Sequence, residues 1–243
     1  MRHGSSSRET PNTSSFSRIF IYFVTMRLHR SENLLGAALF VLLAVCQQCV
    51  SADPSILAPP EVTMHNGTMY AACKLRPINS LPDGVPRVYG HVLFKQDHPD
   101  GKLNVIFRIK GFPTNVTQEP HRAVHIHQYG DLGQECKAAG GHYNPSDVHH
   151  PNHPGDFGNF QPEGGKIHML MELEATLFGG LSVIGRAVVV HEKMDDLGLG
   201  GDAGSLLNGN AGRRIGCCVI AIYPANLWNM YHEQVQNSLL RRN

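Results

Sequence analysis

Six histidines and one aspartate between residues 125 and 191 form the pattern that most constrains what this chain can fold into: His125, His127, His142, His150, His153, Asp156 and His191. The whole chain has 15 histidines, so metal-binding side chains are concentrated in this region. Neutral imidazole is a good ligand for copper, zinc, nickel and iron. The pattern therefore predicts a site for two metal ions.

The motif His125-Ile126-His127 predicts a strand that carries two ligands on one face. Strand side chains alternate with a period of two, so both rings point the same way while Val124 and Ile126 can enter a core. His191 ends the apolar run 186–190, which predicts another buried strand.

The segment 142–156 predicts a loop that carries a second group of ligands. Three prolines and a glycine interrupt this segment, and such residues break regular elements. Three His and one Asp on a loop are typical of a closed, tetrahedral zinc site. The four ligands would be His142, His150, His153 and Asp156.

The remaining apolar segments are short and are separated by glycine and proline, which favours an all-β domain with long loops. The 243 residues allow one domain plus extensions. Strands are predicted over residues 87–94, 105–109, 167–177, 182–190 and 215–223.

Four motifs resemble those of the copper/zinc superoxide dismutases. The segments 125–131 (HIHQYGD) and 209–217 (GNAGRRIGC) resemble the two signatures of the family, and 155–159 (GDFGN) and 190–198 (VHEKMDDLG) also match. The similarity covers residues 87–225, and the Cys217-Cys218 pair resembles the extracellular member. The resemblance implies a Greek-key β-sandwich or barrel with long metal-binding and electrostatic loops.

The resemblance also implies how the ligands divide between the ions. Copper, which changes oxidation state, is expected on His125, His127, His142 and His191. Zinc, which has no accessible redox step, is expected on His142, His150, His153 and Asp156. His142 would bridge both ions as an imidazolate and pass on a proton, which makes it a candidate catalytic residue. His149 is the alternative to His150 if the register differs by one residue.

Two further residues match family positions. Arg214 matches the catalytic arginine that guides the anion to copper, although an arginine here could also satisfy loop carbonyls. Asp195 matches the carboxylate that links a copper ligand to a zinc ligand, here His125 and His150. Cytoplasmic relatives place two glutamates and a lysine in the loop 195–212 to steer the anion; this chain has Ala203, Gly204 and Leu207 there.

Residues 1–52 predict a targeting segment that is removed. Leu34–Cys46 is an apolar run of signal-peptide length that is short for a membrane span. Small residues before Asp53 offer a cleavage site; the start is Met1 or Met26, and a retained signal anchor is the alternative. We expect the mature chain to comprise an extension (53–86), the dismutase domain (87–225) and a tail (226–243) that is either frayed or a packing helix.

Cleavage there would leave four cysteines, Cys73, Cys136, Cys217 and Cys218. A secreted chain would pair them, and the residues alone permit three connectivities. The resemblance implies the disulfides Cys136–Cys217 and Cys73–Cys218. Secretion would also make Asn66 and Asn115 candidate glycosylation sites.

The net charge of the chain limits the classes of partner that it can bind. A formal net charge of +1 does not indicate the strongly basic surface that nucleic-acid binding requires. Extracellular members of the family end in a basic run that binds heparan sulfate, whereas this tail ends with only Arg241 and Arg242, so heparan sulfate binding is doubtful. Family analogy suggests a homodimer or a homotetramer without a membrane span in the mature form.

The expected function is that of a secreted, extracellular antioxidant enzyme that converts superoxide to molecular oxygen and hydrogen peroxide. Two alternatives are a copper-binding or copper-delivery module and a zinc-stabilised structural domain without dismutase activity. All seven ligands and Arg214 are present, which favours the enzyme.

Overall fold

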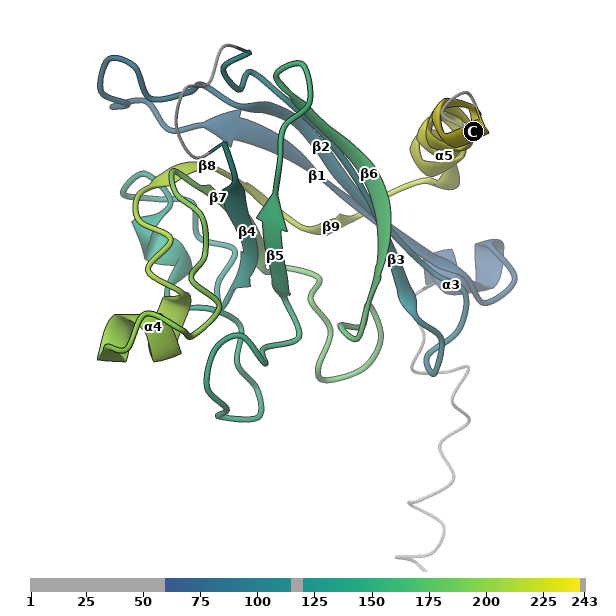
Figure 1. Cartoon of the computed structure of the whole chain (residues 1–243). Coiled ribbons are helices and arrows are strands. Elements are labelled where there is room, and N and C mark those ends of the chain that lie inside the picture. Colours follow the sequence, from purple (N-terminus) through teal and green to yellow (C-terminus); the bar gives the residue numbers. More distant parts are fainter. Residues whose placement is uncertain (1–59, 115–119, 241–243) are drawn as a thin grey trace, which may run out of the picture. The chain divides into compact units, whose positions relative to one another are not determined.

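A computed structural model describes residues 60–114 and 120–240, with side chains described up to residue 237 (Figure 1). The expected targeting segment and the Asn115 sequon lie outside these residues, and within them no helix is long and apolar enough to cross a membrane. The elements are α3 (Pro60–Met64), β1 (Met69–Pro77), β2 (Tyr89–Gln96), β3 (Leu103–Lys110), β4 (Arg122–His127), η2 (Lys137–Ala139), β5 (Asp156–Phe160), β6 (Lys166–Leu173), β7 (Ala187–His191), α4 (Ala203–Asn208), β8 (Arg214–Val219), β9 (Ala221–Ile222) and α5 (Ala225–Leu240).

The strands form one antiparallel sheet that curls into a nearly closed barrel, which confirms the predicted all-β class. Their order is β5-β4-β7-β8-β1-β2-β3-β6, and β9 pairs with β1. β6 lies beside β3 and β7 beside β4, so neighbours in the sheet are not neighbours in the chain, as in a Greek key. Figure 1 shows the β4, β5 and β7 strands on one side and β2, β3 and β6 on the other.

Strand boundaries differ from the sequence predictions at several points. β7 begins only at Ala187, because residues 182–186 form a turn in which Gly185 has a φ of 82°. The Ser182 hydroxyl stabilises this turn by accepting from the N–H of Ile184 at 3.1 Å, and it donates to the Leu177 carbonyl at 2.8 Å. β1 lies within residues 53–86, which were assigned to an extension, yet it pairs with β2, β8 and β9. The barrel therefore starts before residue 87.

The barrel interior is filled by apolar side chains from alternate strand positions. Phe107 is fully buried and contacts Phe157 and Phe160, with ring centroids 5.0 and 4.7 Å away. On β4, Val124 and Ile126 are fully buried. The alternate β4 residues, His125 and His127, therefore lie on the side away from this packing.

The outer face of β1, β2, β3 and β6 is partly covered by α5. Ala72, Leu93 and Ile106 lie side by side in the strand register and form a cluster with Trp228 and Val235 of the helix. Leu227 and Tyr231 pack against the same cluster. An apolar row on the outside of the barrel thus explains why the tail forms a docked helix.

Two disulfides tie remote segments together. Cys73 of β1 is bonded to Cys218 of β8, and Cys136 is bonded to Cys217. Cys217 and Cys218 are adjacent on a strand and face opposite sides, so each reaches a different partner. The Cys136–Cys217 bond fastens the loop after β4 to a buried cluster that includes Ile78 and Val189.

Replacing Trp228 with Ala should release α5 from the barrel. Trp228 is 5% exposed, and removing a buried large aromatic side chain costs about 3 kcal/mol or more. We expect lower thermal stability and less helical signal in far-ultraviolet circular dichroism. Met230 is 45% exposed on the same helix, so Met230→Ala is the control. Equal stability losses in the two variants would contradict the docking of α5 through Trp228.

Candidate metal centre

The structure brings the seven predicted ligands into two adjoining sets. The donor atoms of each set lie within 4.8 Å of one another. One set joins His125, His127, His142 and His191, and the other joins His142, His150, His153 and Asp156. His142 belongs to both. His149, the alternative to His150, is exposed and belongs to neither.

In the first set, backbone carbonyls orient the rings of His127 and His191. The Nδ1 atom of His127 lies 2.9 Å from the Gly140 carbonyl, and that of His191 lies 3.3 Å from the Gly212 carbonyl. A carbonyl can only accept, so each Nδ1 carries the proton and each Nε2 presents a lone pair. The two Nε2 atoms are 3.3 Å apart and converge on the same point.

The His125 ring is oriented by the buried carboxylate of Asp195. Its Nε2 atom donates to an Asp195 oxygen at 2.8 Å, which leaves Nδ1 as the lone-pair nitrogen. The other Asp195 oxygen lies 2.7 Å from Nε2 of His150. Asp195 therefore links one ring of each set. The close grouping of these three residues is explained by hydrogen bonds.

The second set is built around the Asp156 carboxylate. One Asp156 oxygen lies 2.9 Å from Nδ1 of His142, and the other lies 2.8 Å and 3.0 Å from Nδ1 of His150 and His153. The outer nitrogen of His153 lies 3.1 Å from the Val148 carbonyl. Four donor atoms thus approach one another from different directions, as in a closed tetrahedral site.

Several donor atoms are buried without a hydrogen-bond partner, which shows that a cation fits this arrangement. They are Nδ1 of His125, Nε2 of His142, Nδ1 of His150 and Nδ1 of His153. The last two are close to Asp156 but are not aligned for a hydrogen bond. Buried nitrogen atoms are costly when unsatisfied. A pair of cations would satisfy all four.

His142 differs from the other rings in how its two nitrogens are used. In each of the other five histidines, one nitrogen is held by a carbonyl or by Asp195 and the other faces the ligand set. His142 directs Nδ1 toward Asp156, and its Nε2 has no partner. Among the ligand rings that the structure describes, only His142 can supply a donor to both sets.

Burial keeps three of these rings, His127, His142 and His191, neutral. Burial and the charge of Arg214 lower the pKa of His127, and burial and His125 lower the pKa of His191, both well below the ordinary value. Burial lowers the pKa of His142 to about 4, although the Asp156 carboxylate opposes it. At pH 7 these rings are unprotonated, which is the state that binds metals.

His150 behaves in the opposite way. Burial disfavours its charged form, but the carboxylates of Asp156 and Asp195 outweigh burial and raise the pKa of His150 to about 9. The adjacent histidine rings hold the pKa values of both carboxyls well below their usual range despite burial. A ring nitrogen must be deprotonated to bind a metal, so a metal ion that binds His150 would displace the proton that the raised pKa favours.

Arg214 lies at a cavity of about 380 Å³ that opens onto the first set. His127, His142 and His191 line this cavity, as does the exposed side chain of Leu207. Guanidinium nitrogens of Arg214 donate to the carbonyls of Cys136 and Gly140 at 2.6 and 2.5 Å. The loop therefore holds the positive charge of Arg214 beside the ligands, so the residue satisfies loop carbonyls while it faces the cavity.

Several supporting groups escaped the sequence analysis. The carbonyls of Gly140, Val148 and Gly212 orient ligand rings, but backbone groups leave no side-chain signal in a sequence. The Asn159 side chain bonds both the N–H and the carbonyl of Asp195 at 2.7 Å. Asn159 lies in one of the motifs that resemble the family, which was the available clue.

Gly209 packs where no side chain could fit. It has a φ of 65°, and an added Cβ would collide with the Asp195 carboxylate and lie 2.7 Å from Nε2 of His150. Its carbonyl also accepts from the N–H of Asp196 at 2.8 Å. Gly209 therefore lets the loop close over the residue that links the two sets.

Comparison with known proteins agrees with this geometry. The family model for copper/zinc superoxide dismutase matches residues 88–220. Extracellular superoxide dismutase [Cu-Zn] of Homo sapiens is 49% identical over 164 residues, covering 67% of this chain and 68% of the relative. The protein of the same name from Oryctolagus cuniculus is 45% identical over 178 residues, or 72% of each chain. Superoxide dismutase [Cu-Zn] A of Xenopus laevis is 42% identical over 144 residues, or 56% of this chain and 91% of the relative.

The family model covers more than half of the chain, and its range contains both ligand sets, Asp195 and Arg214. The cofactors of the family are copper and zinc, and the two sets of this structure have donors suited to them. This chain belongs to the copper/zinc superoxide dismutases, a family of oxidoreductases.

Proposed function

We propose that this chain is a secreted superoxide dismutase that converts two superoxide anions and two protons to molecular oxygen and hydrogen peroxide. The observation that carries the proposal is the single ring, His142, that serves both ligand sets. An all-imidazole set that opens onto a cavity suits copper, and a closed set with a carboxylate suits zinc. When bound, copper would supply the change of oxidation state, and zinc would supply only charge.

The residues of the chain account for anion binding and proton handling. Arg214 offers a cation at the cavity to attract and orient superoxide. His142 lines the same cavity, and its buried Nε2 atom has no hydrogen-bond partner in the protein, so this atom can accept a proton when it is not ligating. Asp156 holds the other side of that ring in place. This arrangement puts a proton donor and a positive charge next to the reacting anion.

Assignment of the ions follows the two sets. Copper is proposed on His125, His127, His142 and His191, and zinc on His142, His150, His153 and Asp156. A copper-delivery module or a zinc-stabilised structural domain would not need Arg214 at an open cavity beside four imidazoles. The presence of Arg214 at this cavity therefore favours the enzyme over both alternatives.

Secretion is proposed from the apolar run before residue 53 and from the two disulfides, which persist in oxidising compartments. The relatives named extracellular support the same location. Asn66 is exposed in the turn before β1 and is accessible to a glycan. We propose a homodimer or homotetramer, which light scattering of the secreted form would distinguish.

Purification of the secreted chain and analysis of its metals would test the function. We expect about one copper and one zinc per chain, together with catalytic removal of superoxide measured by pulse radiolysis. Zinc without copper would support a structural domain. Both metals without dismutase activity would support a binding module and overturn the enzyme.

Replacing His142 with Ala should remove a donor from both sets. We expect weaker binding of both metals and loss of most dismutase activity, measured as metal content after dialysis and as superoxide decay. His149→Ala is the matched control, because His149 is exposed and outside both sets. Full activity of the His142 variant would refute the shared ring.

Replacing Asp195 with Asn should weaken both sites from a position that touches neither ion. The two rings bond different oxygens of Asp195, and in Asn one of these oxygens becomes an NH2 group that cannot accept. Loss of such a supporting bond lowers metal affinity by about 10- to 100-fold. Asp196→Asn serves as control, because Asp196 bonds loop groups such as Ser205 and Asn210 rather than ligand rings. If both variants lowered metal affinity equally, Asp195 would stabilise only the loop and would have no specific role in orienting the ligand rings.

Replacing Arg214 with Ala should slow anion capture. Steering by local positive charge raises association rates by about tenfold or more and weakens with salt. We expect a lower bimolecular rate with a weaker salt dependence, partial rescue in Arg214→Lys, and little change in metal content. Arg213→Ala is the control, because Arg213 is exposed and paired with Glu192 at 3.3 Å. An unchanged rate and salt dependence in Arg214→Ala would contradict the role.

A further inference from the structure

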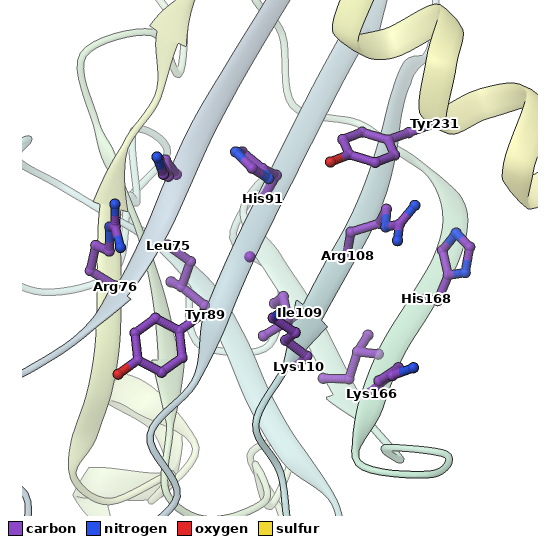
Figure 2. A pocket seen from close by; sticks show the side chains of 13 residues that line it. Leu75, Arg76, Tyr89, His91, Arg108, Ile109, Lys110, Lys166, His168 and Tyr231 are labelled. Atoms are coloured by element: carbon purple, nitrogen blue, oxygen red, sulfur yellow. The ribbon is translucent and has the colours of Figure 1, made fainter.

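The outer face of β1, β2, β3 and β6 carries an open groove where basic side chains gather (Figure 2). Its volume is about 430 Å³, within the range of small-molecule sites. Among the described residues that line it, none is acidic and seven are basic: Lys74, Arg76, His91, Arg108, Lys110, Lys166 and His168. None of these belongs to the metal centre, so the groove is a separate feature.

The strand register explains why these charges meet. One row of residues crosses the four strands at positions that are paired in the register. A second row lies two residues away from the first on each strand. Both rows therefore project outward, while Leu75 and Ile109 between them are buried. The first row consists of Lys74, His91, Arg108 and His168. The second row consists of the basic residues Arg76, Lys110 and Lys166, together with Tyr89.

Four cations of the groove have no acidic partner in the part of the chain that the structure describes. Among the described residues, no salt bridge engages Lys74, Arg76, Lys110 or Lys166. Lys110 and Lys166 are directly opposite each other across β3 and β6, and like charges in that position repel. A bound anion would relieve this repulsion.

The pKa of His91 is affected by the same positive charges. Burial, followed by the charges of Lys74, Arg108 and Arg76, lowers the pKa of His91. Figure 2 shows His91 in the groove between Arg76 and Arg108. This histidine can therefore serve as a probe of any anion that enters.

One wall of the groove is held in place by α5. The Arg108 guanidinium lies over the Tyr231 ring, 4.3 Å from its centroid, and also bonds the side chain of Gln234. Tyr231 stands at the rim in Figure 2. The docked α5 thus leaves the two rows uncovered, and its side chains hold the Arg108 guanidinium in place.

We propose that this groove binds a small anion that carries two or more sulfate or phosphate groups. Neighbouring strands are about 4.8 Å apart, so opposed cations such as Lys110 and Lys166 match groups on adjacent ring carbons of a sugar or a cyclitol. Several cations on one concave surface favour a multivalent anion over a monovalent one. The inference goes beyond the dismutase activity and does not depend on it.

The test uses the full secreted chain with its metals and two compact probes. Sucrose octasulfate represents a sulfated source, inositol hexakisphosphate a phosphorylated source, and sucrose and inositol are the uncharged controls. Calorimetry should show saturable binding of at least one charged probe that weakens with salt, and NMR should show that the pKa of His91 rises on binding. The probe that binds more tightly identifies the source.

The double variant Lys110→Gln, Lys166→Gln should weaken binding by about tenfold for each charge-assisted bond that is lost. Lys102→Gln is the control, because Lys102 precedes β3 outside the groove and forms an exposed pair with Glu174, which contributes little to stability. Three outcomes would each overturn the proposal: no saturable binding of either probe, unchanged affinity in the double variant, or a His91 pKa that does not respond.

Discussion

The buried Asp195 carboxylate is the interaction on which the metal centre depends. Its two oxygens accept from His125 and His150 at 2.8 and 2.7 Å, and it is fully buried. Asn159 holds the backbone on both sides of this carboxylate, and Gly209 leaves room for it. One side chain thereby sets the tautomer of a ring in each ligand set, so the two sets are coupled before any cation binds.

The side-chain part of this site was readable from the sequence. The His-x-His spacing on a strand and the run of ligands on a proline-interrupted loop predicted which residues would meet, and the structure groups the same seven. The resemblance to a known family was needed to divide them between two ions and to pair the cysteines. Period-two patterns alone could not choose between His149 and His150, since both are loop residues.

Other parts required the three-dimensional structure. Segment 53–86 has few long apolar runs, so the place of β1 in the barrel was not evident, although β1 pairs with three strands. Residues 182–186 are apolar enough to suggest a strand, but Gly185 and the Ser182 hydroxyl bend them into a turn. The two basic rows also arise only through the register, because their members come from four strands scattered between residues 74 and 168.

A single peptide unit connects one of the predicted metal ligands to the guanidinium that lies at the cavity. The Gly140 carbonyl accepts both from Nδ1 of His127 and from the guanidinium of Arg214. Gly140 has a φ of 74°, and an added Cβ would lie 2.9 Å from the Tyr129 ring. The orientation of this one amide plane therefore contributes to the spacing between a predicted metal ligand and the guanidinium at the cavity, at a position that a side chain would obstruct.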